Sequence, residues 1–181
     1  MTSLAVWAIA SGVTVALLAG PCILAPGVAR KMIAGFPRSK IPAWILCFID
    51  VFWVAIIVAS LQLGPRYDWV RPVAYILAPV LLIMIVMAMN ELLAPRALGF
   101  LLLLLPSPII DAARFHPSEL RLVMTALCYV FVVIGIVWVL NPYMFRKMMA
   151  MWIKSDNTCR LMGTAHAVLA AVILALAFLV Y

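Results

Sequence analysis

Residues 97–105 read ALGFLLLLL, and the sequence PSP follows at 106–108. This stretch is apolar enough for a membrane. An α-helix rises about 1.5 Å per residue, however, so nine residues cover about 14 Å, half of the hydrocarbon core of a bilayer. As a re-entrant or interfacial helix that ends at Pro106, the stretch leaves five membrane spans in the chain, and as a distorted crossing it makes six. We predict five spans, with six as the alternative.

The composition places the rest of the chain in a membrane as well. Of its 181 residues, 69% are apolar and 10% are charged, whereas a soluble domain is about half apolar and about a quarter charged. The same values exclude a disordered chain and a disulfide framework. We predict an all-α polytopic membrane protein that forms a single integral membrane domain over residues 1–181. The five expected spans are residues 4–24, 43–63, 72–93, 120–140 and 161–181.

The basic residues of the loops favour the alternative. With five spans and the first loop in the cytoplasm, seven Lys and Arg side chains lie inside and six outside, so there is no bias. With six spans, nine lie inside and four outside, in agreement with the positive-inside rule. In both schemes the uncharged segment before the first span lies outside the cytoplasm. That segment lacks the positively charged start of a cleaved secretory signal.

The net charge of +7 indicates loops that lie against anionic lipid headgroups. A nucleic-acid-binding surface would need a basic stripe with interleaved aromatic residues, and these short loops offer none. We therefore expect the lipid bilayer as a partner and no nucleic acid. The candidate headgroup-binding residues are Arg30, Lys31, Arg146 and Lys147.

Two loops share a motif. Residues 24–34 read LAPGVARKMIA and residues 140–150 read LNPYMFRKMMA, so both fit L-x-P-x-x-x-R-K-M-h-A at an offset of 116 residues. We predict an internal repeat with copies at about 4–63 and 120–181, joined by residues 64–119. With five spans the two copies point in opposite directions, as inverted repeats of transporters do. With six spans they are parallel.

Each repeat unit consists of a span, a proline, a short amphipathic helix and the next span. Proline fits the first turn of the short helix, where its missing N–H is not needed, and the basic edge of such a helix faces lipid phosphates. We expect short interfacial helices after Pro26 and Pro142 and, in a weaker third copy, after Pro95. In that copy leucines replace the basic edge, so its helix should lie deeper.

Three ionisable residues are candidates for intramembrane sites, where a charge costs about 2.5–3.5 kcal/mol and needs a partner. Asp50 and His166 lie inside expected spans and are 116 residues apart, which makes them equivalent positions of the repeat. They form either a coupled proton or cation site or two separately satisfied groups, Asp50 with a nearby Arg or Lys and His166 with a backbone carbonyl. Glu91, at the end of the third span, is expected to pair with Arg96 or to add a second carboxylate to the Asp50 site.

The sequence gives no sign of catalysis. Residues 111–121 read DAARFHPSELR and are the most polar stretch, but Ser118 is typical of a helix N-cap, and the patterns of nucleophile elbows and metalloproteases are absent. The four cysteines form no CxxC, and the methionines have no adjacent Cys or His motif. We predict that the protein is not an enzyme, has no metal site and uses no cofactor.

Residues 135–178 resemble the small two-span bacterial membrane proteins of unknown function. In that family a proline and an arginine follow the first span, and an Arg-hydrophobic-x-Gly step opens the second. Here these are Pro142, Arg146 and the run Arg160-Leu161-Met162-Gly163. The resemblance implies a multi-pass protein of the bacterial inner membrane and carries no activity with it.

The function that fits these observations is a small non-enzymatic membrane subunit or scaffold, which packs with the helices of a membrane protein partner or of a second copy. Small residues on an exposed face, such as Gly12, Ala16 and Ala19 of the first span, would serve that packing. The alternative is a small proton- or cation-coupled carrier that uses Asp50 and His166. A carrier requires these two side chains to meet in a hydrated cavity.

Overall fold

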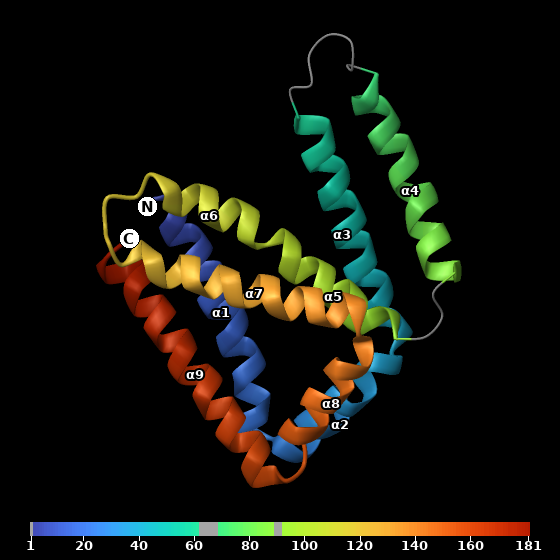
Figure 1. Ribbon diagram of the computed structural model, residues 1–181. Helices are drawn as coiled ribbons and strands as arrows, with labels where there is room; N and C mark the ends of the chain where they lie inside the picture. Colours follow the sequence, from blue (N-terminus) through green and yellow to red (C-terminus); the bar gives the residue numbers. More distant parts are fainter. Residues whose placement is uncertain (1, 62–68, 89–91) are drawn as a thin grey trace.

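The computed structural model describes residues 2–61, 69–88 and 92–181, and these residues fold into helices joined by short connections, with no strand among them. Figure 1 shows the arrangement. In chain order the helices are α1 (Ser3–Leu24), α2 (Pro26–Gly35), the 3-10 helix η1 (Phe36–Arg38), α3 (Lys40–Ser60), α4 (Val70–Ala88), α5 (Leu93–Leu104), α6 (Pro106–Arg114), α7 (Arg121–Leu140), α8 (Pro142–Trp152) and α9 (Asp156–Leu179).

Six helices are long and apolar enough to cross a membrane, judged by length and composition. The predicted all-α class and the membrane-spanning character of the helices are therefore confirmed. Five of the six correspond to the expected spans, and the sixth contains the apolar stretch at residues 97–105. The six are Ser3–Leu24, Lys40–Ser60, Val70–Ala88, Leu93–Arg114, Arg121–Leu140 and Asp156–Leu179.

Pro106 ends α5, as predicted, but a second helix continues from it, so the helical segment does not stop there. Leu105 keeps helical dihedral angles (φ −56°, ψ −39°), and its N–H donates to the Leu101 carbonyl at 3.0 Å. Pro106 then stands at the first position of α6, where a proline costs no hydrogen bond. The chain thus remains helical from Leu93 to Arg114, a length of 22 residues instead of the nine that we counted.

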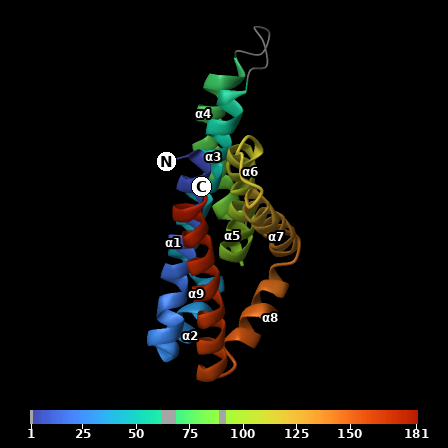
Figure 2. The same ribbon diagram turned by 90° about the vertical axis from the view of Figure 1, so that its left-hand side faces the viewer.

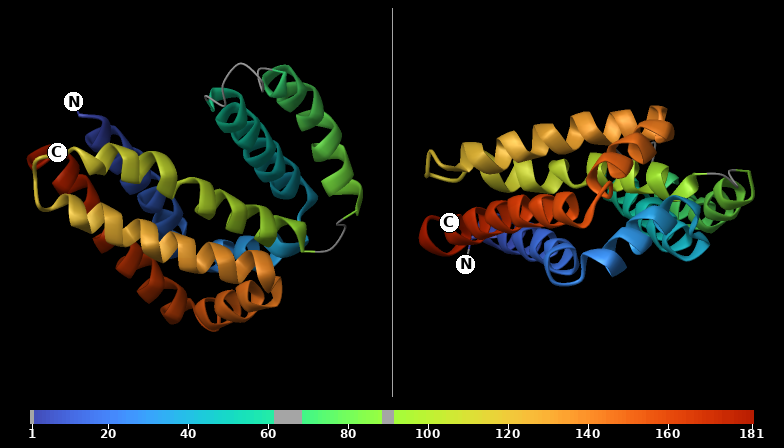
Figure 3. Two further views of the ribbon diagram at one scale, coloured as in Figure 1. Left: turned by 45° about the horizontal axis from the view of Figure 1, so that its top comes forward. Right: turned by 90° about the horizontal axis from the view of Figure 1, so that it is seen from below.

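The helices associate mainly in pairs. The most extensive pairing joins α1 to α9, the two ends of the chain, and α5 pairs with α7 and α3 with α4. In addition, α5 packs against α3, so it lies between α3 and α7. Figure 2 shows α1 and α9 running side by side, and Figure 3 shows the α3–α4 pair extending away from the other spans.

The α1–α9 pairing depends on small residues. A Cβ atom on Gly12 would lie 2.8 Å from Leu174 Cγ, and one on Gly163 would lie 2.8 Å from Cys22 Cβ. Ala19 is buried at the same contact, and the Cys22 thiol donates to the Leu18 carbonyl of its own helix at 3.6 Å. Gly12 and Ala19 therefore do not form the exposed docking face that we predicted, because α9 covers them.

The short helices α2 and α8 begin at Pro26 and Pro142, as predicted. Pro95 lies in the first turn of the 12-residue helix α5, and α6 follows α5 directly, so the two form one helical segment to Arg114. Among the six segments, Leu93–Arg114 has the highest share of buried residues. This agrees with the expectation that this leucine-rich segment lies deep.

Candidate functional site

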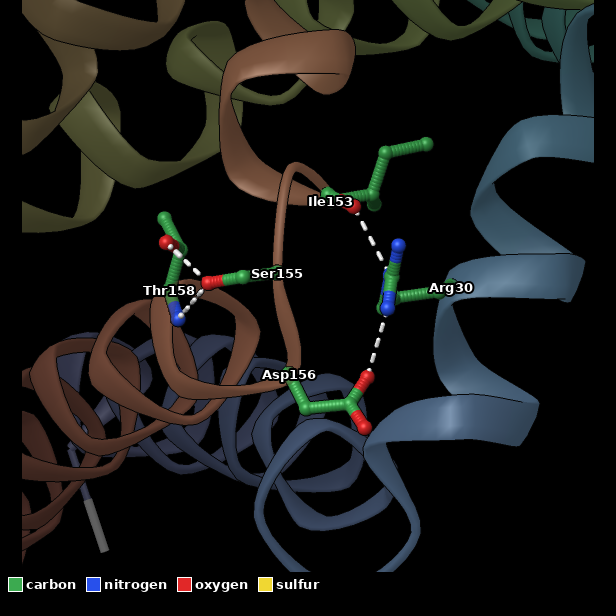
Figure 4. A network of polar contacts seen from close by, with 5 residues as sticks. All are labelled: Arg30, Ile153, Ser155, Asp156 and Thr158. Atoms are coloured by element: carbon green, nitrogen blue, oxygen red, sulfur yellow. Dashed lines mark hydrogen bonds and ion pairs between the residues drawn. The ribbon is translucent and has the colours of Figure 1, made fainter.

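An ion pair joins the two loops that carry the repeated motif. Arg30 Nη1 lies 2.7 Å from Asp156 Oδ1, and Arg30 Nε donates to the Ile153 carbonyl at 2.7 Å (Figure 4). Beside it, Ser155 caps α9 by accepting the Thr158 N–H at 3.1 Å. Arg30, which we proposed as a headgroup ligand, is thus engaged within the protein. The contact places α2 at the same end of the molecule as the start of α9.

A groove runs between α2 and α8 at this end, with a volume of about 370 Å³. Arg146 and Lys147 are its only charged lining residues among those that the structure describes, and both are exposed. Lys31 is exposed as well but does not line the groove. The other lining residues are Ile33, Ala34, Pro37, Tyr143, Met149, Ala150 and Ile153.

A buried cluster of aromatic and apolar side chains lies beside the groove. Phe145 of α8 is buried, and its ring centroid lies 4.8 Å from that of Trp138 in an edge-to-face contact. On its other side Phe145 lies 5.7 Å from the Phe36 ring of η1. These rings fix α8 against α7 and against the end of α2, so the groove has well-supported walls.

Asp50 lies near the middle of α3 and is 7% exposed. It follows Ala43 and Cys47 on the buried face of the helix, and these two residues pack with Leu82 of α4 and Ala97 of α5. Neither carboxylate oxygen of Asp50 has a hydrogen-bond partner within the described residues. The expected partnership with a nearby Arg or Lys is therefore not found in this part of the chain. Among the described residues, this buried carboxyl group departs most clearly from the rule that an ionisable group within a span has a partner.

His166 is satisfied locally. Its Nδ1 donates to the Met162 carbonyl one turn earlier at 2.8 Å, and its ring meets that of Trp152 edge-on at 5.2 Å. This is the backbone-bonded arrangement of our second interpretation. Because α9 packs against α1, whereas the Asp50 helix packs against α4 and α5, the structure does not bring Asp50 and His166 together (Figure 1). The coupled pair is not supported. Glu91, the third candidate, lies outside the described residues.

The polar loop between α6 and α7 uses its groups for its own structure. His116 Nδ1 accepts the Ser118 N–H at 3.2 Å, and Arg121 donates to the His116 carbonyl at 2.7 Å. Ser118 is not the N-cap of α7, which is Leu120, although its hydroxyl accepts the Leu120 N–H at 3.2 Å. These groups satisfy neighbouring backbone atoms.

Tyr181 fastens this loop to the end of α9. Its hydroxyl donates to the Leu120 carbonyl at 2.6 Å, and its ring meets that of His116 edge-on at 5.3 Å. Burial raises the pKa of the Tyr181 hydroxyl above its ordinary value of 10.0. At the same end, Thr2 donates to the Tyr181 carbonyl at 2.7 Å, so the loop, α1 and α9 are joined.

The sequence analysis missed the groove. The amphipathic pattern identified the basic edge of α8 and directed it toward lipid phosphates, but it did not show that α2 and α8 lie side by side. The shared motif was the available signal, since two similar amphipathic helices at one end of a bundle can pack together. Across residues 2–61, 69–88 and 92–181, no group of three or more His, Cys, Asp or Glu side chains could hold a metal ion.

Comparison with known proteins yields one match. No curated protein and no solved structure matches the chain. Residues 123–177, which cover α7, α8 and most of α9, match the family described as "uncharacterized protein conserved in bacteria (DUF2065)". The predicted resemblance of this part of the chain to bacterial proteins of unknown function is thereby confirmed.

Proposed function

We propose that this chain is a non-enzymatic membrane protein of the bacterial inner membrane, a subunit or scaffold that packs with partner helices and crosses the bilayer six times. The observation that carries the scaffold role is the isolation of α4. This helix packs extensively on α3 alone, and its apolar side chains are otherwise exposed. In a bilayer, such faces are covered by lipid or by another helix that packs closely.

The chemistry of the exposed α4 face fits a partner helix. Met84 and Met87 are 61% and 72% exposed, and methionine adapts its shape to irregular surfaces. Ile76 lies about three turns before Met87 on the same side of the helix, and it is 70% exposed. The α3–α4 pair extends away from the other spans (Figure 3), and α5 packs on α3 rather than on α4. We therefore assign the partner contact to α4.

Six crossings are supported by the Arg30–Asp156 ion pair. Two loops that touch must lie on the same side of the membrane, so the number of crossings between them is even. The helices between them are α3, α4, the α5–α6 segment and α7, which makes four. Five spans would leave three crossings between Arg30 and Asp156 and separate these residues by the bilayer.

The six-span scheme also satisfies the charge distribution, because nine Lys and Arg then lie on the side of α2 and α8. That side is the cytoplasm. The repeat copies are parallel in this scheme. The helix boundaries support the repeat, since Pro26 and Pro142 open α2 and α8, and Lys40 and Asp156 open α3 and α9, both at the offset of 116 residues.

The topology is tested with single cysteines in a variant without the four native ones. Lys31→Cys and Lys147→Cys should react with a membrane-impermeant maleimide in inverted vesicles and not in spheroplasts. Phe115→Cys, 86% exposed in the α6–α7 loop, should show the reverse. Labelling of Lys31→Cys and Lys147→Cys from opposite sides would overturn the six-span proposal.

The scaffold role is tested by photo-crosslinking in the native membrane. Benzoylphenylalanine at position 76 of α4 should give one discrete protein adduct, which Met84→Trp weakens. The matched control is position 17 of α1, because Leu17 is 71% and Ile76 70% exposed; it should give lipid adducts only. An adduct to a second copy identifies a homo-oligomer. If position 76 yields only lipid adducts, the scaffold role is wrong.

A second candidate, a proton- or cation-coupled carrier, rests on Asp50 alone, because its buried carboxyl group has no partner within the described residues. A hydrophobic carbodiimide reacts with a protonated intramembrane carboxyl group and forms a stable acylurea. The carrier predicts modification of Asp50, protection by a monovalent cation, and no modification in Asp50→Asn. Modification that no cation affects would exclude cation coupling.

A further inference from the structure

We propose that the groove between α2 and α8 binds one anionic phospholipid, with the phosphate on Arg146 and Lys147 and the glycerol and upper acyl chain on the apolar lining. This inference goes beyond the scaffold role and does not depend on it. The lipid is expected at one groove with defined lining residues, and not at the basic loops in general.

The shape of the groove fits this ligand. Its volume of about 370 Å³ lies within the range of small-molecule sites, and is of the order of a headgroup with its glycerol. One face of α8 supplies Tyr143, Arg146, Lys147 and Ala150, which lie three, one and three residues apart and so project on one side of the helix. The facing wall comes from α2 and from Pro37.

The charges select an anion. Arg146 and Lys147 form no ion pair within the part of the chain that the structure describes. Asp156 follows the lining residue Ile153 by three positions, and it is already paired with Arg30 (Figure 4). The other described acidic residues are Asp50 in the middle of α3, and Asp111 and Glu119 at the α6–α7 end. Among the described residues, no acidic side chain therefore pairs with the two basic residues of the groove.

The apolar lining favours a phospholipid over a free phosphate. Apart from the two basic residues and the Tyr143 hydroxyl, the lining side chains carry no hydrogen-bonding group. A free phosphate ion has no apolar part and needs donors on most of its oxygens. A phospholipid offers both parts in the required order, and the short helices lie at the ends of membrane-spanning helices, where headgroups are found.

The test uses native mass spectrometry of the full chain in a non-ionic detergent, with phosphatidylglycerol or phosphatidylcholine added. The proposal predicts one tightly bound phosphatidylglycerol and much weaker phosphatidylcholine. Arg146→Gln/Lys147→Gln should weaken phosphatidylglycerol about thirtyfold, from roughly a fivefold loss per basic residue at a membrane surface. The matched control, Lys31→Gln/Arg160→Gln, removes the same charge outside the groove and should change affinity by less than about threefold.

A third variant separates shape from charge. Ala150 is exposed and lines the groove, so Ala150→Trp should fill the space and abolish the single bound lipid while every charge remains. Equal losses in the two charge variants, an unchanged affinity in Ala150→Trp, or equal binding of phosphatidylcholine would each overturn the proposal. Displacement of the lipid by glycerol 3-phosphate at a comparable concentration would identify a free-phosphate site instead. Crosslinking at position 76 reports the scaffold role separately.

Discussion

The Arg30 guanidinium lies 2.7 Å from the Asp156 carboxylate, although 126 residues separate them in the chain. Arg30 belongs to α2 and Asp156 to the first turn of α9, so the pair joins the two loops of the repeated motif (Figure 4). Through its Nε atom, Arg30 also binds the Ile153 carbonyl. This contact holds the two loops at one end of the molecule.

The Arg30–Asp156 ion pair joins α2 to α9, but it contributes little to the free energy of unfolding. The two side chains are 37% and 56% exposed, and exposed ion pairs contribute about 0.2–1 kcal/mol. We expect Asp156→Asn to lower the free energy of unfolding by about 0.5 kcal/mol. Arg30→Gln should cost more, because it also removes the bond to Ile153. Thermal unfolding in detergent measures both, and equal effects of the two variants would contradict this ranking.

Two glycines set the distance between α5 and α7. A Cβ atom on Gly135 would lie 2.8 Å from the Gly99 carbonyl oxygen, and one on Gly99 would lie 3.0 Å from the Gly135 carbonyl oxygen. Backbone atoms cannot move aside as side chains do, so Gly135→Ala must separate the helices. We expect a loss of about 1–3 kcal/mol in unfolding free energy.

The control for this variant is Gly35→Ala. Gly35 has helical dihedral angles (φ −78°, ψ −25°), and a Cβ atom there would meet nothing within 4 Å. The added methyl group should therefore leave stability unchanged or raise it by up to about 1 kcal/mol. If both variants unfold at the temperature of the wild type, the α5–α7 contact is looser than described.

Asp50 is expected to destabilise the fold in which it is buried. Its carboxylate lies where apolar residues belong, and a charge within a span costs about 2.5–3.5 kcal/mol. Asp50→Leu, which keeps the branched shape of the side chain, should raise the unfolding temperature in detergent, and Asp50→Asn should raise it less because the amide remains polar. A lower unfolding temperature in both variants would show that the carboxyl group has a stabilising partner.

Tyr181 gives a prediction for alkaline pH. Burial raises the pKa of its hydroxyl in the folded state above the ordinary value of 10.0, so above pH 10 the unfolded chain loses this proton first. Stability from this group is complete below pH 10 and declines as the pH rises toward the folded-state pKa.

Tyr181→Phe removes both this pH dependence and the bond to the Leu120 carbonyl. Below pH 10 the variant should unfold more easily by about 0.5–1.5 kcal/mol. The difference from the wild type should shrink as the pH rises above 10, as followed by thermal unfolding. A difference that grows with pH would reverse the sign argued here.

The sequence predicted most helix ends to within a few residues, because apolar runs and prolines act locally. It failed at Pro106, where the same proline fits both an ended helix and the first turn of a new one. The choice depends on Leu105 remaining helical against its neighbours, and this is a property of packing rather than of the run 97–105. The sequence also did not predict which helices pack together, because many apolar faces of similar composition could pair with one another.

For the candidate sites, too, local sequence predicted the unusual residues but not which of them lie together. The sequence identified Asp50 and His166 as exceptional, because an ionisable group in an apolar run is a local signal. Their meeting depended on the relative placement of α3 and α9, which an offset of 116 residues does not determine. The groove at Arg146 and Lys147 required knowledge that α2 and α8 share one end of the molecule.

The pairing of α1 with α9 has a consequence for biosynthesis. Helices of a membrane protein enter the bilayer in the order in which the ribosome makes them, and α9, the partner of α1, is made after α2 to α8. Until residues 156–179 have been inserted, the small-residue face around Gly12 and Ala19 lacks the helix that covers it in the folded protein. The first span must therefore stay in the bilayer without its main partner while the helices between them are made.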